Sequence, residues 1–150
     1  MESIIKEIIN KEIHVNPDKI TSLSGGSINQ SYRVSHQNKS WFIKLNIKKK
    51  YPKMFELEAE GLSLLRSTEF TIPNVIATGE YLDYNYLILA FIETLPANKT
   101  QWDVLGRKLA MMHRISQKEF GLDRSNYIGS LTQKNNKEET WSEFYANNRV

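Results

Sequence analysis

Apolar residues near the start of the chain recur at helical spacing. Ile4, Ile5, Ile8 and Ile9 fall on one side of a helix over residues 3 to 13, and charged residues occupy its other side. The Asn16-Pro17 pair stops this helix, because proline cannot continue the backbone hydrogen-bond ladder. The pattern therefore predicts an amphipathic helix at the start of the chain.

Five short runs typical of β-strands follow, over residues 19–23, 30–36, 40–46, 75–80 and 86–91. Gln37-Asn38-Lys39 predicts a hairpin between the second and third runs, and Asp83-Tyr84-Asn85 a turn before the fifth. A second helix is expected over residues 53 to 67. Its apolar stripe consists of Met54, Phe55, Leu57, Gly61, Leu62, Leu64 and Leu65. This order predicts an α+β fold, a mixed antiparallel sheet with a helix packed on one face.

The character of the chain changes after this sheet. Residues 92 to 99 have the composition of a linker, which divides the chain into a lobe over residues 1–91 and a helical region over 100–150. A helix over residues 101 to 116 is expected to bury Trp102, Leu105, Leu109 and Met112, with His113 beside them as a core histidine. A polar loop over residues 120 to 136 precedes a third helix, which is still running at Val150. We therefore expect the sequence to end within an element.

One lysine interrupts the apolar third strand. By alternation Lys44 shares a face with Phe42, while Trp41, Ile43 and Leu45 share the other. A lysine in an apolar strand is costly unless it meets an anion or a carboxylate. A glycine-bearing turn before such a strand, here at Gly25-Gly26, is typical of the phosphate end of a kinase-type nucleotide site. The alternative is a surface hairpin with a solvated lysine.

One glutamate falls within the apolar stripe of the second helix. Glu58 lies between Met54 and Leu62 on that face, so it needs a partner, and Lys44 is the candidate. An edge position that reaches solvent is the alternative, and Glu56 takes the role if the helix is rotated.

Composition narrows the class of protein. Hydrophobic residues make up 40% and charged residues 25%, as in globular proteins, and the net charge is +3. The only basic run, residues 48–50, has no interleaved aromatics, so no nucleic-acid surface is expected. The chain has no cysteine and only three scattered histidines, so we expect neither disulfides nor a metal site. No apolar run approaches membrane-spanning length, and a cytoplasmic protein without membrane contact is the default expectation.

Several motifs in order resemble the fructosamine/ketosamine-3-kinase family. They cover nearly the whole chain: Gly25 to Asn29, Phe42 to Asn46, Met54 to Glu58, Leu105-Gly106 with His113, Phe120 to Asp123, Ile128-Gly129, Gln133, Asn135, and Trp141 with Phe144-Tyr145. The resemblance implies a protein-kinase-like fold, related to aminoglycoside and choline kinases. The small lobe would be an antiparallel sheet with one packed helix and an extra N-terminal helix, followed by the first helices of the large lobe. It also implies ATP-dependent phosphorylation of a sugar hydroxyl on ketoamine (glycation) adducts, small or protein-bound.

The resemblance assigns roles to individual residues. Lys44 would hold the α- and β-phosphates, Glu58 would hold the lysine, and Leu89 would be the gatekeeper behind the adenine. The triphosphate would be covered by Gly25, Gly26, Ser27, Ile28 and Asn29, and the adenine edge bonded by backbone groups of Ala90, Phe91 and Ile92. The substrate side, or the loop that frames it, would be formed by Gln133, Asn135, Trp141 and Tyr145.

The chain also departs from the family pattern. Lys137 and Thr140 stand where the family usually has a tryptophan and an acid, and this bears on substrate identity. The family's catalytic loop, a His-Gly-Asp segment, and its metal-binding aspartate would lie beyond Val150, so we expect no catalytic or Mg²⁺-binding residue within this chain and no activity of it alone. A catalytically inactive module that binds nucleotide or a partner, with self-association through an incomplete lobe, and a kinase for aminoglycosides or choline-like metabolites remain alternatives.

Overall fold

The computed structural model describes residues 1–25 and 28–150 and divides into two compact units. The first unit comprises Met1–Ser63 and Ile72–Glu93, and the second comprises Leu64–Thr71 and Thr94–Val150. Each unit is described by itself. Within the described residues, no helix has the length and apolar character needed to cross a bilayer.

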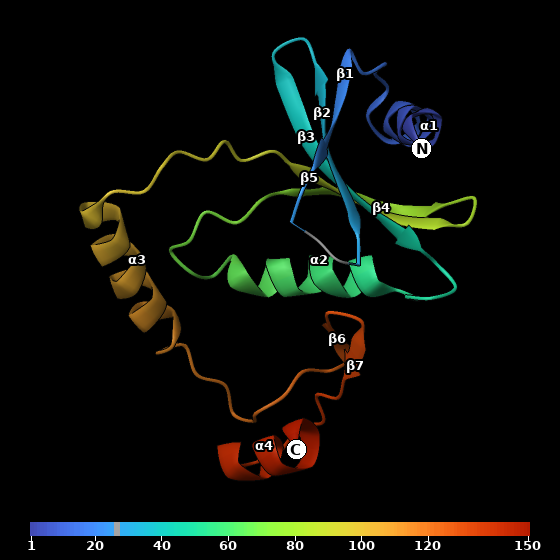
Figure 1. The fold of residues 1–150 in the computed structure, drawn as a ribbon. Coiled ribbons are helices and arrows are strands. Elements are labelled where there is room, and N and C mark those ends of the chain that lie inside the picture. The colour runs from blue at the N-terminus through green and yellow to red at the C-terminus, as the bar shows by residue number, and fades with distance from the viewer. Residues whose placement is uncertain (26–27) are drawn as a thin grey trace. The chain divides into compact units, whose positions relative to one another are not determined.

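The first unit is built on a five-stranded antiparallel sheet. Its strands are β1 (Lys19–Leu23), β2 (Gln30–His36), β3 (Lys39–Ile47), β4 (Val75–Tyr81) and β5 (Tyr84–Ala90), in the order β1-β2-β3-β5-β4. Helix α1 (Glu2–Ile13) and all but the last two residues of α2 (Met54–Leu65) belong with it. Figure 1 shows the crossed strands with α1 and α2 beside them. The predicted α+β architecture is confirmed.

The main core lies between α1 and one face of the sheet. Ile5, Ile8 and Ile9 of α1 are fully buried, as their spacing predicted. They belong to one cluster with the β3 side chains Trp41, Ile43 and Leu45, and with Val34, Tyr86 and Ile88. Because side chains alternate along a strand, Phe42, Lys44 and Asn46 lie on the opposite face, which the α1 core does not cover.

The predicted stripe of α2 is only partly correct. Met54 and Phe55 in its first turn are buried, whereas Leu64 is 59% and Leu65 38% exposed. These last-turn leucines belong to the second unit. Helical periodicity identifies an apolar face but not how far along the helix a partner covers it.

The β4–β5 turn lies earlier than the sequence predicted. Leu82 and Asp83 form it, with Leu82 at φ 53°, while Tyr84 and Asn85 already belong to β5. Leucine rarely adopts positive φ, so nothing in the sequence indicated that Leu82 belongs to the turn. Asp83 and Asn85 are typical turn residues, and for this reason the turn was predicted too far toward the C-terminus.

The second unit holds α3 (Lys99–Met112), the small hairpin of β6 (Asn126–Ile128) and β7 (Leu131–Gln133), and α4 (Trp141–Arg149). The expected burial of one α3 face is wrong, because the helix buries none of its residues and Trp102 is 62% exposed. His113 is exposed as well and forms the C-cap of α3, so it is no core histidine.

The hairpin of β6 and β7 lies in the region that was predicted to be a loop. Gly129, at φ 61° between its strands, was the signal for it.

Candidate functional site

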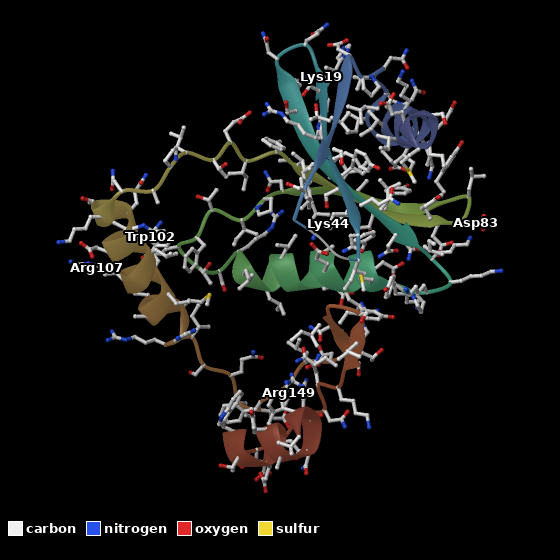
Figure 2. All side chains as sticks on the ribbon, viewed as in Figure 1. Lys19, Lys44, Asp83, Trp102, Arg107 and Arg149 are labelled. Atoms are coloured by element: carbon white, nitrogen blue, oxygen red, sulfur yellow. The ribbon has the colours of Figure 1, made fainter. Side chains whose placement is uncertain are left out.

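Lys44 and Glu58 meet on the face of the sheet opposite α1. Lys44 Nζ donates to Glu58 Oε1 at 2.6 Å, and the two side chains are 24% and 29% exposed. Lys44 comes from the middle of β3 and Glu58 from the second turn of α2, and Figure 2 labels Lys44 on its strand. Glu56 is exposed, so the helix orientation expected for Glu58 is confirmed. The contact leaves a cation on this face, held by a carboxylate and still open to solvent.

Gly25 precedes β2 in the sequence, and β2 is the neighbour of β3 in the sheet. Gly25 has φ 127°, a conformation that L side chains rarely adopt, and a Cβ at this position would meet none of the described atoms within 4 Å. Gly26 and Ser27 lie outside the described residues. Ile28 and Asn29 are half-buried, and Asn29 Oδ1 accepts a hydrogen bond from Asn46 Nδ2 at 3.2 Å.

The last two residues of β5 and the two that follow it are those expected around an adenine. Leu89 is buried, and because its register partner is Phe42 it lies on the same face as Lys44. The amide of Ala90 donates to the carbonyl of Asn74 at 2.8 Å, and that of Phe91 to the carbonyl of Ser40 at 3.4 Å. Within the described part of the chain, the amide of Ile92 finds no acceptor, so among these three residues its N–H remains available to a ligand.

Arg33 fixes the segment after β5 against β2. Its guanidinium forms an ion pair with Glu93, with Nη1 3.3 Å from Oε2, and lies 4.3 Å from the ring centroid of Phe91. It also donates from Nε to Ser40 Oγ at 3.2 Å. These contacts set the position of the backbone on either side of Ile92.

Two buried amides, which sequence reasoning did not single out, lie on the Lys44 face. Asn46 on β3 and Asn85 on β5 are register partners, and Asn85 Nδ2 donates to Asn46 Oδ1 at 3.1 Å. The available signal was Asn46 itself, a polar residue two positions after Lys44 in an apolar strand.

In the second unit, Asn135 holds its loop together. Its amide is buried and donates to Arg124 O at 3.1 Å and to Asn126 Oδ1 at 3.0 Å. Its Oδ1 accepts from Arg149 Nη2 at 2.7 Å. All these bonds are internal, which favours the loop-framing role over substrate contact for this side chain.

The aromatic residues of the second unit form an exposed group. Trp141 is 57% and Tyr145 51% exposed, with ring centroids 6.0 Å apart, and Phe120 meets Trp141 edge-on at 5.9 Å. Gln133 lies half-buried on β7. Trp141 and His113 also line an open groove together with Leu64.

The two departures from the family pattern have structural partners. Lys137 pairs with Asp123, and this contact lowers the pKa of the Asp123 carboxyl and raises the pKa of Lys137. Thr140 is the N-cap of α4, where its hydroxyl accepts from the Glu143 amide at 3.2 Å. Both side chains therefore make contacts within the second unit.

Within the described ranges, no three histidine or acidic side chains gather as they would to hold a metal ion. A half-buried ammonium, the open space around Gly25 and an available amide at Ile92 suit the phosphates and the base of a nucleotide.

Comparison with known proteins gives matches along the whole chain. The family model described as fructosamine kinase matches residues 1–150. A protein of Vibrio vulnificus named a probable ketoamine kinase is 37% identical over 131 residues, which are 85% of this chain and 45% of that protein. A probable ketoamine kinase of Escherichia coli K12 is 32% identical over 130 residues, again 45% of its length. The chain spans about half the length of these relatives.

Solved structures show the same fold. One from Haemophilus somnus, assigned as a fructosamine-3-kinase, superposes with a TM-score of 0.84 at 23% identity, covering all of this chain and 52% of the other. A spectinomycin phosphotransferase, solved with ADP and spectinomycin, gives a TM-score of 0.60 at 20% identity over 75% of this chain and 37% of its own. The predicted kinase-like fold is thereby confirmed.

Proposed function

This chain belongs to the fructosamine kinase family, and we propose that its first unit is the nucleotide-binding lobe of an ATP-dependent kinase that phosphorylates a sugar hydroxyl of ketoamine adducts. The observation that supports this most directly is the 2.6 Å contact between Lys44 and Glu58 on the open face of the sheet. A lysine pinned by a helix glutamate is the arrangement with which kinase-like folds hold nucleotide phosphates.

Each residue then has a physical task. Lys44 places a positive charge against the α- and β-phosphates, and Glu58 keeps that ammonium group in position. The backbone from Gly25 to Asn29 covers the triphosphate, because a glycine turn lets amides approach it closely. Leu89 closes the back of the adenine site, and the amide of Ile92 donates to the adenine edge.

The remaining catalytic groups are assigned to the half of the family's length that this chain does not span. Phosphoryl transfer needs a base for the acceptor hydroxyl and Mg²⁺ to neutralise charge on the phosphates. We place the base and the Mg²⁺ ligands there, so the 150 residues alone are expected to bind nucleotide without transferring a phosphoryl group.

Nucleotide titration tests the proposal. ATP is titrated into the 150-residue chain by calorimetry, with Lys44→Met as the test variant and Lys48→Met as the matched control. Lys48 is also a lysine paired with a glutamate, Glu80, at 3.2 Å, but on an exposed surface. Loss of a charge-assisted contact to phosphate is expected to weaken ATP binding by Lys44→Met about tenfold or more, while Lys48→Met binds like the wild type. Equal affinities for Lys44→Met and the wild type would contradict the proposal.

The acceptor is tested in a family member of full length that carries this N-terminal half. Lys44→Ala is expected to lower phosphoryl transfer sharply while the protein stays folded. Fructosyl-lysine, an aminoglycoside and choline serve as competing acceptors. Transfer to fructosyl-lysine alone supports the ketoamine assignment, and preference for either other acceptor contradicts it.

A further inference from the structure

A chain of hydrogen-bonded amides runs from β5 through β3 to Asn29, the residue before β2. Asn46 and Asn85 are only 4% and 5% exposed, in a part of the sheet that otherwise buries apolar side chains. Burying a carboxamide is costly unless its groups are bonded, so the two side chains require a specific arrangement. The Lys44–Glu58 pair does not explain them, since neither amide contacts it in the described structure.

The backbone carbonyl of Tyr51 determines how both amides are oriented. A carbonyl oxygen only accepts hydrogen bonds, so Asn85 must present Nδ2 to it, at 2.8 Å. The same Nδ2 donates to Asn46 at 3.1 Å, so Asn46 must present Oδ1 there. Rotating either amide by half a turn would bring two oxygens or two NH₂ groups together.

The orientation continues to Asn29, the residue before β2. With its Oδ1 facing Asn85, Asn46 uses Nδ2 to donate to Met54 Sδ and to Asn29 Oδ1, both at 3.2 Å. Asn29 must therefore present its oxygen to Asn46, which places its own Nδ2 on the other side of its carboxamide. For that Nδ2, the described residues offer no acceptor.

Asn29 lies close to the phosphate-binding lysine in the sheet register. Gln30 pairs with Leu45 and Ser31 with Lys44, so the next position places residue 29 opposite Asn46. By alternation Asn29, Ser31 and Lys44 share one face. An NH₂ group on the same face as the Lys44 ammonium suits an anion, because phosphate oxygens accept hydrogen bonds and repel an amide oxygen.

We propose that Asn29 binds a nucleotide phosphate through its Nδ2 and that Asn46 and Asn85 are positioning residues that hold its amide in that orientation. The inference rests on the proposed nucleotide-binding function and adds a donor and its supporting relay to it. Without the relay, the Asn29 amide is free to rotate and to present its oxygen to the phosphate.

A double-mutant cycle tests the relay in the 150-residue chain. ATP and adenosine affinities are measured for the wild type, Asn29→Ala, Asn46→Leu and the double variant. Asn29→Ala removes the donor to phosphate and is expected to weaken ATP binding by about tenfold. Asn46→Leu is expected to weaken it only a few-fold, because a freely rotating Asn29 amide keeps its donor but adopts the donating orientation only part of the time. Because Asn46 acts through Asn29, the double variant is expected to bind like Asn29→Ala, with no further loss. Adenosine, which has no phosphate, is expected to bind all four proteins equally.

Control variants distinguish a positioning role of Asn46 from a general loss of folded structure. Asn46→Val is the substitute if Asn46→Leu fails to fold, since valine is smaller and suits a strand. Asn16→Leu, an exposed asparagine bonded to Asn10 at 3.2 Å, controls for the replacement itself. Additive losses, or an equal loss of adenosine binding, would overturn the relay. ATP binding by Asn46→Leu equal to the wild type would overturn the relay alone, whereas no ATP binding by the wild type would overturn the proposed function and the relay with it.

Discussion

Lys44 Nζ lies 2.6 Å from Glu58 Oε1, although the two residues are 14 positions apart and belong to a strand and a helix. The pair needs β3 to present Lys44 away from the α1 core and α2 to present Glu58 toward the sheet. Both side chains remain about a quarter exposed, so the contact orders the lysine without removing it from solvent. An ordered lysine that remains accessible to solvent is suited to binding a ligand.

Neutralising Glu58 is expected to affect binding more than stability. In Glu58→Gln the lysine loses its charged partner, and ATP affinity is expected to fall several-fold because Lys44 is no longer held. The free energy of unfolding is expected to change by about 1 kcal/mol or less, since solvent screens a partly exposed pair. Calorimetric ATP titration and urea unfolding measure the two effects. Glu80→Gln, which removes the partner of Lys48, is the control, and ATP affinity of Glu58→Gln equal to that control would contradict the prediction.

Gly79 and Gly61 are expected to respond to alanine in opposite directions. A Cβ at Gly79 would lie 2.5 Å from the hydroxyl oxygen of Tyr86, which is buried and bonded to Glu12, so Gly79→Ala is expected to destabilise the chain by about 1–3 kcal/mol. At Gly61 in α2 the space is open, and Gly61→Ala is expected to stabilise by up to about 1 kcal/mol through helix propensity. Thermal unfolding of the two variants checks both signs, and destabilisation of Gly61→Ala as large as that of Gly79→Ala would refute the steric account.

Glu12 is expected to make α1 docking sensitive to acid. Tyr86 donates to Glu12 Oε1 at 2.6 Å, and this bond, with that from Lys11, lowers the pKa of the Glu12 carboxyl from 4.5. A lowered pKa means that the stabilisation is present above the unfolded-state pKa and is lost as pH falls through the folded-state pKa. Unfolding free energies measured from about pH 7 down to about pH 3 should therefore fall less steeply in Glu12→Gln, which keeps the shape without the titration. Identical pH profiles would rule the carboxylate out as a source of acid sensitivity.

Tyr86 is expected to show the opposite sign in alkali. Burial, with the bond to Glu12, raises the pKa of the Tyr86 phenol from 10.0. The stabilisation from the protonated phenol is then fully present below pH 10 and is lost as pH rises through the folded-state pKa. Tyr86→Phe is expected to be less stable near neutral pH, by about 1–2 kcal/mol for the lost hydrogen bond, but less sensitive to alkali. An alkaline profile as steep as that of the wild type would contradict this assignment.

Asn135 is expected to support the second unit. Asn135→Ala removes three hydrogen bonds of a buried amide and leaves the Arg124 carbonyl and the Arg149 guanidinium without these contacts, at a cost of about 2–4 kcal/mol. Asn136→Ala is the matched control, because this neighbouring side chain is exposed and makes no hydrogen bond to the described residues. Limited proteolysis of residues 120 to 149 compares the two. Equal protection in both variants would contradict the loop-framing role of Asn135 and would favour a role in substrate contact.

The sequence determined the elements whose patterns are local. Alternation in 40–46 and helical spacing in 3–13 each specify a face within one element, and the structure places Trp41, Ile43 and Leu45 together with Ile5, Ile8 and Ile9 in one core. The same alternation, with the cost of burying a lone charge, sufficed to pair Lys44 with Glu58.

Only the tertiary structure decided which apolar faces are covered and which amides connect. Helical spacing predicted a buried face for α3 as it did for α1, yet the α3 face stays exposed, because burial depends on the surface that packs against a helix and not on the helix itself. The bonds from Asn85 through Asn46 to Asn29 join three distant segments, and no spacing within any of them encodes the contact. Such relays arise where strands far apart in sequence come into register, and only the assembled sheet fixes that register.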